Sequence, residues 1–175
     1  MADSPLILET PRLTLRPFCL SDADAFFAIF GDPEVFRQTA RSKTLADVEA
    51  ARAWLAREAP LAVARGFGHW AVLERSDGSL IGSCGLGAVP DSRDLELGFT
   101  IAPARWGRGY ATEIAAACAR HGLSRLRAPR VVSLTSPTNL AAQRVLEKIG
   151  MRYLRDEWED GALWLVYALE SSSER

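Results

Sequence analysis

The sequence predicts an α+β, or mixed α/β, fold with one domain over residues 1–170 and a polar tail at 171–175. The expected order is strand, two helices, several strands, helix, strand, helix and two strands, which is not a regular βαβ array. Residues 95–101 alternate as a half-buried strand does. A length of 175 residues and a hydrophobic content of 48% suit a soluble domain with its own core.

Composition argues against several classes of function. The net charge is −1, so no strong field favours nucleic acid or an anionic membrane as a partner. No apolar run reaches the roughly 18 residues of a membrane span, and no signal-peptide pattern opens the chain, so we expect a cytoplasmic protein. Three widely spaced cysteines and two histidines predict neither a disulfide framework nor a metal site.

The first part of the chain predicts a strand and two helices. Residues 13–16 alternate as a strand does. Ser21 to Asp24 resemble a capping box that opens the first helix, and the second helix is expected to begin near Thr44. Gly31-Asp32-Pro33 between them indicates a turn. The expected inward faces are Ala23, Phe26, Phe27 and Phe30 on the first helix, and Val48, Ala51, Trp54 and Leu55 on the second.

The remaining elements follow from turn residues and periodicity. Parallel pairing is expected between 95–101 and 131–134, because a helix separates them along the chain. Gly150 stands where a helix normally ends. The predicted strands are 67–74, 80–89, 95–101, 131–134, the neighbourhood of Tyr153, and 163–169, the last two joined at Asp160-Gly161; the predicted helices are 109–121 and 138–149.

A glycine-rich turn separates the 95–101 strand from the helix that follows. The first N–H groups of a helix have no intrahelical acceptor, and with the helix dipole they attract phosphate. Gly107 and Gly109 let an anion approach the backbone, and Arg105 and Arg108 add positive charge. The alternative is that the glycines serve only to reverse the chain.

Known phosphate loops narrow the choice. A dinucleotide fingerprint requires a third glycine where Thr112 stands, and the chain contains no P-loop string. The pyrophosphate loop of an acyl-CoA transferase fits the pattern.

Three segments resemble one family. They are "LETPRLTLRPFCLSDADAFFAIFGDPEV", "LELGFTIAPARWGRGYATE" and "TNLAAQRVLEKIGMRYL". In this order and spacing, the chain resembles the GNAT N-acetyltransferases, specifically the RimJ/RimL-like branch that acetylates the N-termini of ribosomal proteins. The resemblance implies a splayed mixed sheet of about six to seven strands flanked by about four helices. It also implies acetyl-CoA as co-substrate, no metal, and an amine acceptor.

The resemblance also implies a set of cofactor contacts. The pantetheine arm would lie between the strands at 95–101 and 131–134. The implied contacts are the backbone of Phe99 and Ile101 for pantetheine, the amides of Trp106, Gly107, Arg108, Gly109, Tyr110 and Ala111 for the pyrophosphate, Asn139 for the pantetheine or thioester end, and Arg144 for the CoA phosphates. Asn139 could instead serve only to start its helix. Leu146 stands where many relatives carry a tyrosine that protonates the leaving thiolate, so this acid is missing.

Glu96 is the candidate catalytic base, directly or through water. The alternative is that Glu96 is only a solvated glutamate on a strand.

Trp158, in the acidic loop 156–160, is the candidate substrate contact, since it could stack on a cationic amine. The alternative is that this loop is only the solvated end of a hairpin. Acceptor contacts are expected from 31–42 and 156–161.

Proton chemistry favours an α-amine as acceptor. Near pH 7.4, deprotonating an α-amino group with a pKa of about 8 costs under about 1 kcal/mol, against roughly 4 kcal/mol for lysine. The leading hypothesis is therefore acetylation of a protein or peptide N-terminus, by a monomer or homodimer. Acetylation of a small amine, and a non-catalytic acyl-CoA-binding domain, are the alternatives.

Overall fold

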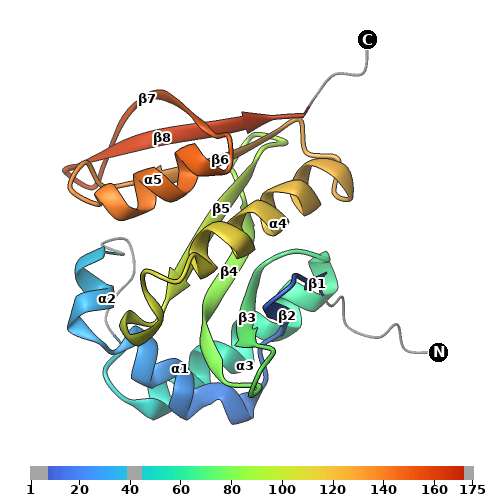
Figure 1. The fold of residues 1–175 in the computed structure, drawn as a ribbon, viewed down its shortest axis with the longest axis vertical. Helices are drawn as coiled ribbons and strands as arrows, with labels where there is room; N and C mark the ends of the chain where they lie inside the picture. Colours follow the sequence, from blue (N-terminus) through green and yellow to red (C-terminus); the bar gives the residue numbers. More distant parts are fainter. Residues whose placement is uncertain (1–7, 39–44, 172–175) are drawn as a thin grey trace.

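The computed structural model describes residues 8–38 and 45–171, which form one eight-stranded mixed sheet with five α-helices and two short 3-10 helices (Figure 1). The mixed α/β prediction is confirmed, with one more strand and one more helix than expected. The strands are β1 (Leu8–Glu9), β2 (Leu13–Pro17), β3 (His69–Glu74), β4 (Leu80–Ala88), β5 (Leu95–Ile101), β6 (Arg130–Thr135), β7 (Arg152–Glu159) and β8 (Ala162–Glu170). The helices are η1 (Leu20–Asp22), α1 (Ala23–Phe30), α2 (Pro33–Gln38), α3 (Val48–Arg65), η2 (Pro103–Arg105), α4 (Tyr110–Ser124) and α5 (Leu140–Lys148).

Helix α2 was not predicted from the sequence, which indicated only a turn at residues 31–33. The side chain of Asp32 accepts a hydrogen bond from the Glu34 N–H at 2.7 Å. Pro33 occupies the first helical position, where its missing N–H costs nothing. An acidic cap followed by proline is a helix start, and this local signal outweighed the turn interpretation.

Two helix starts differ from the prediction. Helix α1 begins at Ala23 after the 3-10 turn η1, and the capping box involves Cys19 and Asp22 in place of Ser21 and Asp24. Asp47 itself caps α3, accepting from the Ala50 N–H at 2.7 Å. The start predicted near Thr44 lies outside the described residues.

Strand order explains how the sheet opens in its middle. The order is β1-β2-β3-β4-β5-β6-β8-β7, antiparallel except between β5 and β6. The predicted parallel pair is confirmed, but it joins only Leu95 to Val131 and Glu96 to Val132. Beyond these pairs the Ser133 hydroxyl donates to the Leu97 carbonyl at 2.9 Å, a side chain replacing a ladder bond. The two strands therefore diverge towards their C-terminal ends.

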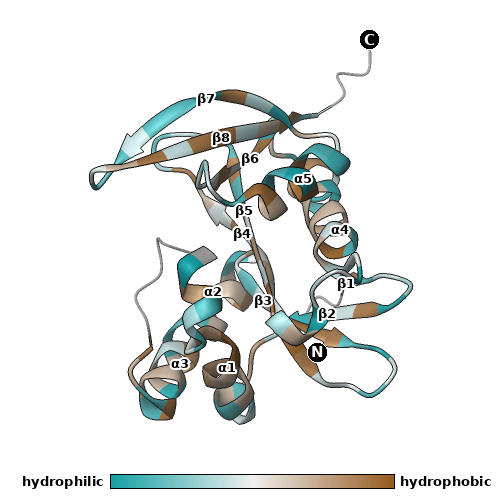
Figure 2. Cartoon of the chain, turned by 60° about the vertical axis from the view of Figure 1, so that its left-hand side comes forward, coloured by the Kyte–Doolittle hydropathy of each residue, from teal (hydrophilic) through white to brown (hydrophobic). Residues whose placement is uncertain are grey.

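The two faces of the sheet carry separate helices (Figure 1). Helices α1 and α3 pack around Phe18, Phe26 and Ala71 on one face. Helix α4 packs on the other face through fully buried Ile114 and Cys118. The outer strand β7 is mostly hydrophilic while β8 is hydrophobic (Figure 2), so the free edge of the sheet is polar, as soluble proteins require.

Two of the three cysteines are core residues. Cys84 and Cys118 are fully buried, and burial raises the pKa of the Cys84 thiol well above its usual value. In the described part of the chain, no cluster of three or more possible metal ligands occurs. No helix among residues 8–38 and 45–171 is both long and apolar enough to cross a bilayer.

Asp22 joins β2 to the start of α1, and we predict that Asp22→Asn lowers the free energy of unfolding by about 2 kcal/mol at pH 7. Its carboxylate accepts from both terminal nitrogens of Arg16, at 2.7 and 2.8 Å, and from the Cys19 N–H at 2.8 Å. Burial alone raises the pKa of Asp22, but these hydrogen bonds outweigh it, so the pKa is lowered. The stabilisation is thus present above the unfolded pKa of about 3.9 and disappears as the pH falls below it.

Urea denaturation of both proteins at pH 7 and pH 3 measures this difference, which should shrink at the lower pH. Glu34→Gln removes an exposed carboxylate paired with Arg37 and serves as the control, expected to change stability by less than about 0.5 kcal/mol. A pH-independent difference for Asp22→Asn would show that packing, not charge, makes Asp22 stabilising.

Candidate functional site

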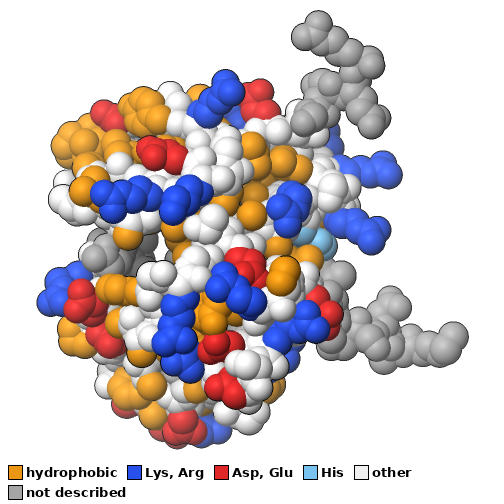
Figure 3. Space-filling view, in the orientation of Figure 1, with side chains coloured by type: hydrophobic (Ala, Val, Ile, Leu, Met, Phe, Trp, Pro, Cys, Tyr) orange, Lys and Arg blue, Asp and Glu red, His pale blue; other side chains and the backbone are white. Residues whose placement is uncertain are grey.

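A cavity of about 1150 Å³ lies where β5 and β6 diverge and extends to α1, α3 and the start of α4. In Figure 3, lysine and arginine side chains gather at the position of α5, beside a hollow between the upper and lower halves of the molecule. All predicted site residues except Arg108 and Trp158 line the cavity: Glu96, Phe99, Ile101, Trp106, Gly107, Gly109, Tyr110, Ala111, Asn139 and Arg144.

The backbone of β5 presents polar groups to the gap. The β4–β5 ladder is flanked by bonds from the Ala102 N–H to the Ile81 carbonyl and from the Val89 N–H to the Asp94 carbonyl. Because hydrogen-bonded pairs alternate in an antiparallel ladder, the odd-numbered residues of β5 direct their N–H and C=O groups towards β6. Phe99 and Ile101 lie beyond the last β5–β6 pair. Their backbone groups therefore face the cavity, where they could form hydrogen bonds with the amide groups of an extended ligand.

Trp106 departs from its predicted role. Its N–H donates to the Pro103 carbonyl at 3.1 Å, so η2 occupies this amide, and the expectation that it is available for a phosphate is wrong. The indole N–H donates to the Ile101 carbonyl at 2.6 Å, which leaves the Ile101 N–H as the group facing the gap. The remaining contribution of Trp106 to the cavity is its half-exposed ring.

The glycine loop has the geometry of an anion site. Gly107 and Gly109 adopt φ values of 74° and 78°, in the left-handed region that favours glycine. The Glu113 N–H donates to the Gly109 carbonyl at 3.0 Å, which is the first bond of α4. The N–H groups of Tyr110, Ala111 and Thr112 consequently have no acceptor within the helix. Gly107 and Gly109 are exposed, so a ligand can reach this helix end.

The carboxylate of Glu74 lies behind the glycine loop and accepts hydrogen bonds from two residues next to that loop. Glu74, at the end of β3, accepts hydrogen bonds from the Tyr110 hydroxyl and, at 2.9 Å, from Arg105. The bond from Tyr110 lowers the pKa of Glu74 and raises that of the Tyr110 phenol. Tyr110 is therefore a neutral donor committed to Glu74, and this phenol does not replace the tyrosine missing at Leu146.

The cavity continues on the α1–α3 face of the sheet. Glu96, Gly98 and Thr100 share this face by strand alternation. His69 lies over Gly98, since a Cβ there would be 3.3 Å from the His69 ring. Desolvation lowers the pKa of His69, which keeps the imidazole neutral at physiological pH. The sequence placed His69 only in a strand, and no local signal showed that it would lie on the same face as Glu96.

Aromatic rings from α1 and α3 line the same cavity as Glu96. The Phe26 ring stacks on Trp54 with centroids 5.0 Å apart, and on Phe30 at 4.3 Å. The Trp54 and His69 rings meet edge to face at 6.5 Å. This end of the cavity is apolar apart from His69 and the β5 side chains.

Helix α5 and the residue that caps it form a further wall of the cavity. The Asn139 side chain accepts from the Ala142 N–H at 3.0 Å, so its oxygen caps α5, which is the structural alternative considered for it. Arg144 is exposed at the rim. Leu146 is fully buried. The buried Thr135 hydroxyl also lines the cavity and has no hydrogen-bond partner within residues 8–38 and 45–171. Thr135 was not singled out from the sequence.

Arg108 and Trp158 lie apart from the cavity lining. Arg108 contributes its carbonyl to a bond with Arg12. Trp158 is 72% exposed near the tip of the β7–β8 hairpin and pairs with Leu163 across it.

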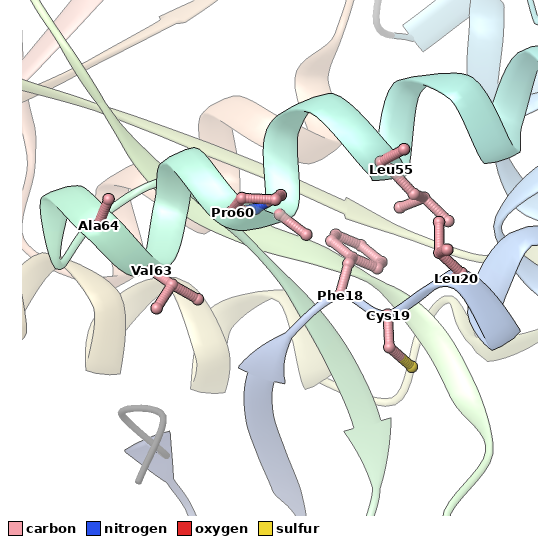
Figure 4. A pocket seen from close by; sticks show the side chains of 9 residues that line it. Phe18, Cys19, Leu20, Leu55, Pro60, Val63 and Ala64 are labelled. Carbon is pink, nitrogen blue, oxygen red and sulfur yellow. The ribbon is translucent and has the colours of Figure 1, made fainter. Parts of the chain in front are cut away.

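A second cavity, of about 550 Å³, lies between η1 and α3 (Figure 4). Its lining is apolar and includes Phe18, Leu20, Pro60 and Val63. In Figure 4 the thiol of Cys19 points away from these side chains, and it contacts Ser21 and Asp22. Unlike the larger cavity, this cavity has no charged side chain among the described residues that line it.

Comparison with known proteins agrees with this geometry. The family model described as Acetyltransferase (GNAT) domain matches residues 12–152, so the chain belongs to the GNAT family and is an N-acetyltransferase. The Bacillus subtilis protein YoaA, described as an uncharacterized N-acetyltransferase, is 32% identical over 147 residues, covering 83% of this chain and 82% of YoaA.

Solved structures have the same fold. An acetyltransferase from Agrobacterium tumefaciens superposes with a TM-score of 0.80 at 27% identity, covering 97% of both chains. Mycobacterium smegmatis RimJ, solved in complex with CoA-disulfide, superposes with a TM-score of 0.76 at 21% identity, covering 93% of this chain and 83% of RimJ. Ribosomal-protein acetyltransferases are thus among the structural neighbours of this chain, as the sequence resemblance implied.

We predict that replacing both Gly107 and Gly109 by valine abolishes acetyl-CoA binding. A branched side chain disfavours positive φ, and its methyl groups occupy the space in front of the helix N-terminus. Calorimetric titration should give a micromolar dissociation constant for the unchanged protein and no measurable heat for the variant.

The matched control replaces Gly66 and Gly78, which have φ values of 71° and 72° and open space around them, but lie away from the cavity. This double variant introduces the same backbone strain and should bind acetyl-CoA normally. Normal binding by the Gly107/Gly109 variant would show that the anion is held elsewhere.

Proposed function

We propose that this protein transfers the acetyl group of acetyl-CoA to the α-amine at the N-terminus of a peptide or protein. The observation that carries the proposal is the opening between β5 and β6, which connects the glycine loop on one side of the sheet to Glu96 on the other. A thioester held in this opening meets an amine arriving from the α1–α3 face.

Cofactor binding would use the groups that the fold leaves available. The N–H groups at the start of α4 would hold the diphosphate, where the positive end of the helix dipole adds to their effect. Backbone groups of Phe99 and Ile101 would pair with the pantetheine amides in place of the missing β6 ladder. Arg144 at the rim would meet the nucleotide phosphates. The binding of CoA-disulfide by RimJ, a protein of the same fold, supports this assignment.

The reaction requires a neutral amine in line with the thioester carbon. Glu96 would accept the proton from the amine, directly or through water, as the nitrogen forms its bond to the carbonyl carbon. The carbon–sulfur bond then breaks, and the electron pair leaves with sulfur. His69, neutral and on the same face, is the second group able to take that proton.

The shape of the acceptor end suggests the class of amine. Phe26, Phe30 and Trp54 would cover an apolar side chain next to the reacting nitrogen. Burying such a side chain contributes roughly 1.5–3 kcal/mol. An N-terminal residue with an apolar side chain satisfies both this wall and the low pKa that favours an α-amine over lysine.

A panel of acceptors tests the proposal. Peptides of equal length that begin with Leu or Phe should show kcat/KM at least about tenfold above peptides that begin with Asp, because only the former bury apolar surface. A peptide with a blocked α-amine and an internal lysine should not react. Thiol release measures the rates, and faster turnover of polyamines or aminoglycosides than of any peptide would replace the proposal by acetylation of a small amine.

For Glu96→Gln we expect kcat to fall by about 10² or more, the range that a positioned general base contributes. Calorimetry should show unchanged acetyl-CoA affinity, since Glu96 lies away from the phosphate loop. His69→Gln is the matched variant on the same face and should retain most activity. If His69→Gln loses activity and Glu96→Gln does not, His69 is the base.

A further inference from the structure

Arg12 reaches the phosphate loop from a distant part of the chain. It lies in the short link between β1 and β2, and one terminal nitrogen donates to the Arg108 carbonyl at 2.9 Å, across 96 residues of sequence. The other terminal nitrogen is 3.6 Å from where a Gly109 Cβ would be. The guanidinium carbon lies 4.5 Å from the centroid of the Tyr110 ring. Arg12 thus packs against three successive residues of the loop.

We propose that Arg12 is a positioning residue that turns the Arg108–Gly109 peptide so that the Gly109 N–H faces the diphosphate. The proposal rests on the acetyl-CoA assignment above. A trans peptide unit is planar, and its C=O and N–H point in opposite directions. No cis peptide occurs among the described residues. Fixing the Arg108 carbonyl on Arg12 therefore directs the Gly109 N–H away from Arg12.

Glycine makes such control necessary. Gly109 lets the Arg108–Gly109 peptide rotate more freely than another residue would, and a Gly109 N–H that points elsewhere cannot bind the ligand. The hydrogen bond from Arg12 selects one orientation before the anion arrives. Such preorganisation increases affinity because binding no longer has to order the loop.

Arg12 is itself held rigidly by Glu113 in the first turn of α4. The Arg12 side-chain Nε donates to one carboxylate oxygen of Glu113 at 2.7 Å, and the Arg12 N–H donates to the other at 2.9 Å. The Thr10 hydroxyl donates to that second oxygen at 2.6 Å. Burial opposes ionisation of Glu113, but these bonds outweigh it and lower its pKa, so Glu113 is a carboxylate at neutral pH.

The pairing separates the role of Arg12 from simple attraction of phosphate. The Glu113 carboxylate compensates the charge of Arg12, so the pair presents little net charge to an anion. Its effect on binding is directional, through the peptide that it orients. If the Arg12–Glu113 ion pair served only to attach the β1–β2 link to α4, its loss would affect the binding of ligands with and without a diphosphate equally.

The experiment compares acetyl-CoA with S-acetylpantetheine, which carries the same thioester but no diphosphate. For Arg12→Met we expect the acetyl-CoA dissociation constant and KM to rise at least tenfold, with kcat unchanged within twofold. The kcat/KM for S-acetylpantetheine should stay within twofold of the unchanged protein. Arg12→Lys should give an intermediate loss, because one ammonium cannot hold both Glu113 and the Arg108 carbonyl in the fork geometry of arginine.

Arg75→Met is the matched control. Arg75 also donates to a backbone carbonyl of the same link, that of Thr10 at 2.9 Å, but does not contact the loop. It should change neither substrate's kinetics. Equal losses for both thioesters in the Arg12 variants, or no loss for acetyl-CoA, would overturn the proposal. Failure of the unchanged protein to bind acetyl-CoA would refute the proposed function instead. Circular dichroism confirms folding, and Arg12→Lys provides the test if Arg12→Met does not fold.

Discussion

The incomplete pairing of β5 with β6 is the constraint on which the rest of the site depends. Two adjacent parallel strands of this length could form a continuous ladder, yet they pair at only two positions. Ser133 then bonds the Leu97 carbonyl through its side chain. On its other edge β6 pairs along its whole length with β8, and β5 pairs along its whole length with β4. The sheet can therefore remain open in its middle without losing either half.

The opening separates the groups that could bind an anion, on one face of the sheet, from the titratable side chains on the other face. On the α4 face, the loop presents unpaired N–H groups, and the charged side chains behind it, Arg12 with Glu113 and Arg105 with Glu74, are paired with each other. Such pairs orient the backbone without competing for the anion. On the opposite face, Glu96 and His69 adjoin aromatic rings. Under the proposed function, the anionic cofactor and the amine would therefore reach opposite sides of one sheet and meet at the gap.

The elements carrying strong local signals could be predicted from the sequence. The alternation in 95–101 gave β5 its observed bounds, and Gly107 and Gly109 located the start of α4 to within a residue. What could not be predicted depends on contacts distant in sequence. Arg12 meets Arg108 across 96 residues, and His69 meets Gly98 only through strand pairing. The Trp106 amide was misassigned because whether an N–H is free depends on the turn before it, not on its neighbouring glycines.

The missing tyrosine at Leu146 matters less than it first suggests. A simple thiol has a pKa of about 8.5, so at pH 7.4 leaving as a thiolate costs only about 1.5 kcal/mol more than leaving protonated. One hydrogen bond to sulfur could recover that amount. The buried Thr135 hydroxyl of β6, which has no hydrogen-bond partner among the described residues, lines the same cavity as Leu146 and is a candidate for this donor. Aligning the amine with the thioester is then the larger demand. Under the proposed mechanism the gap between β5 and β6 would provide that alignment, and Glu96 would take the proton of the amine.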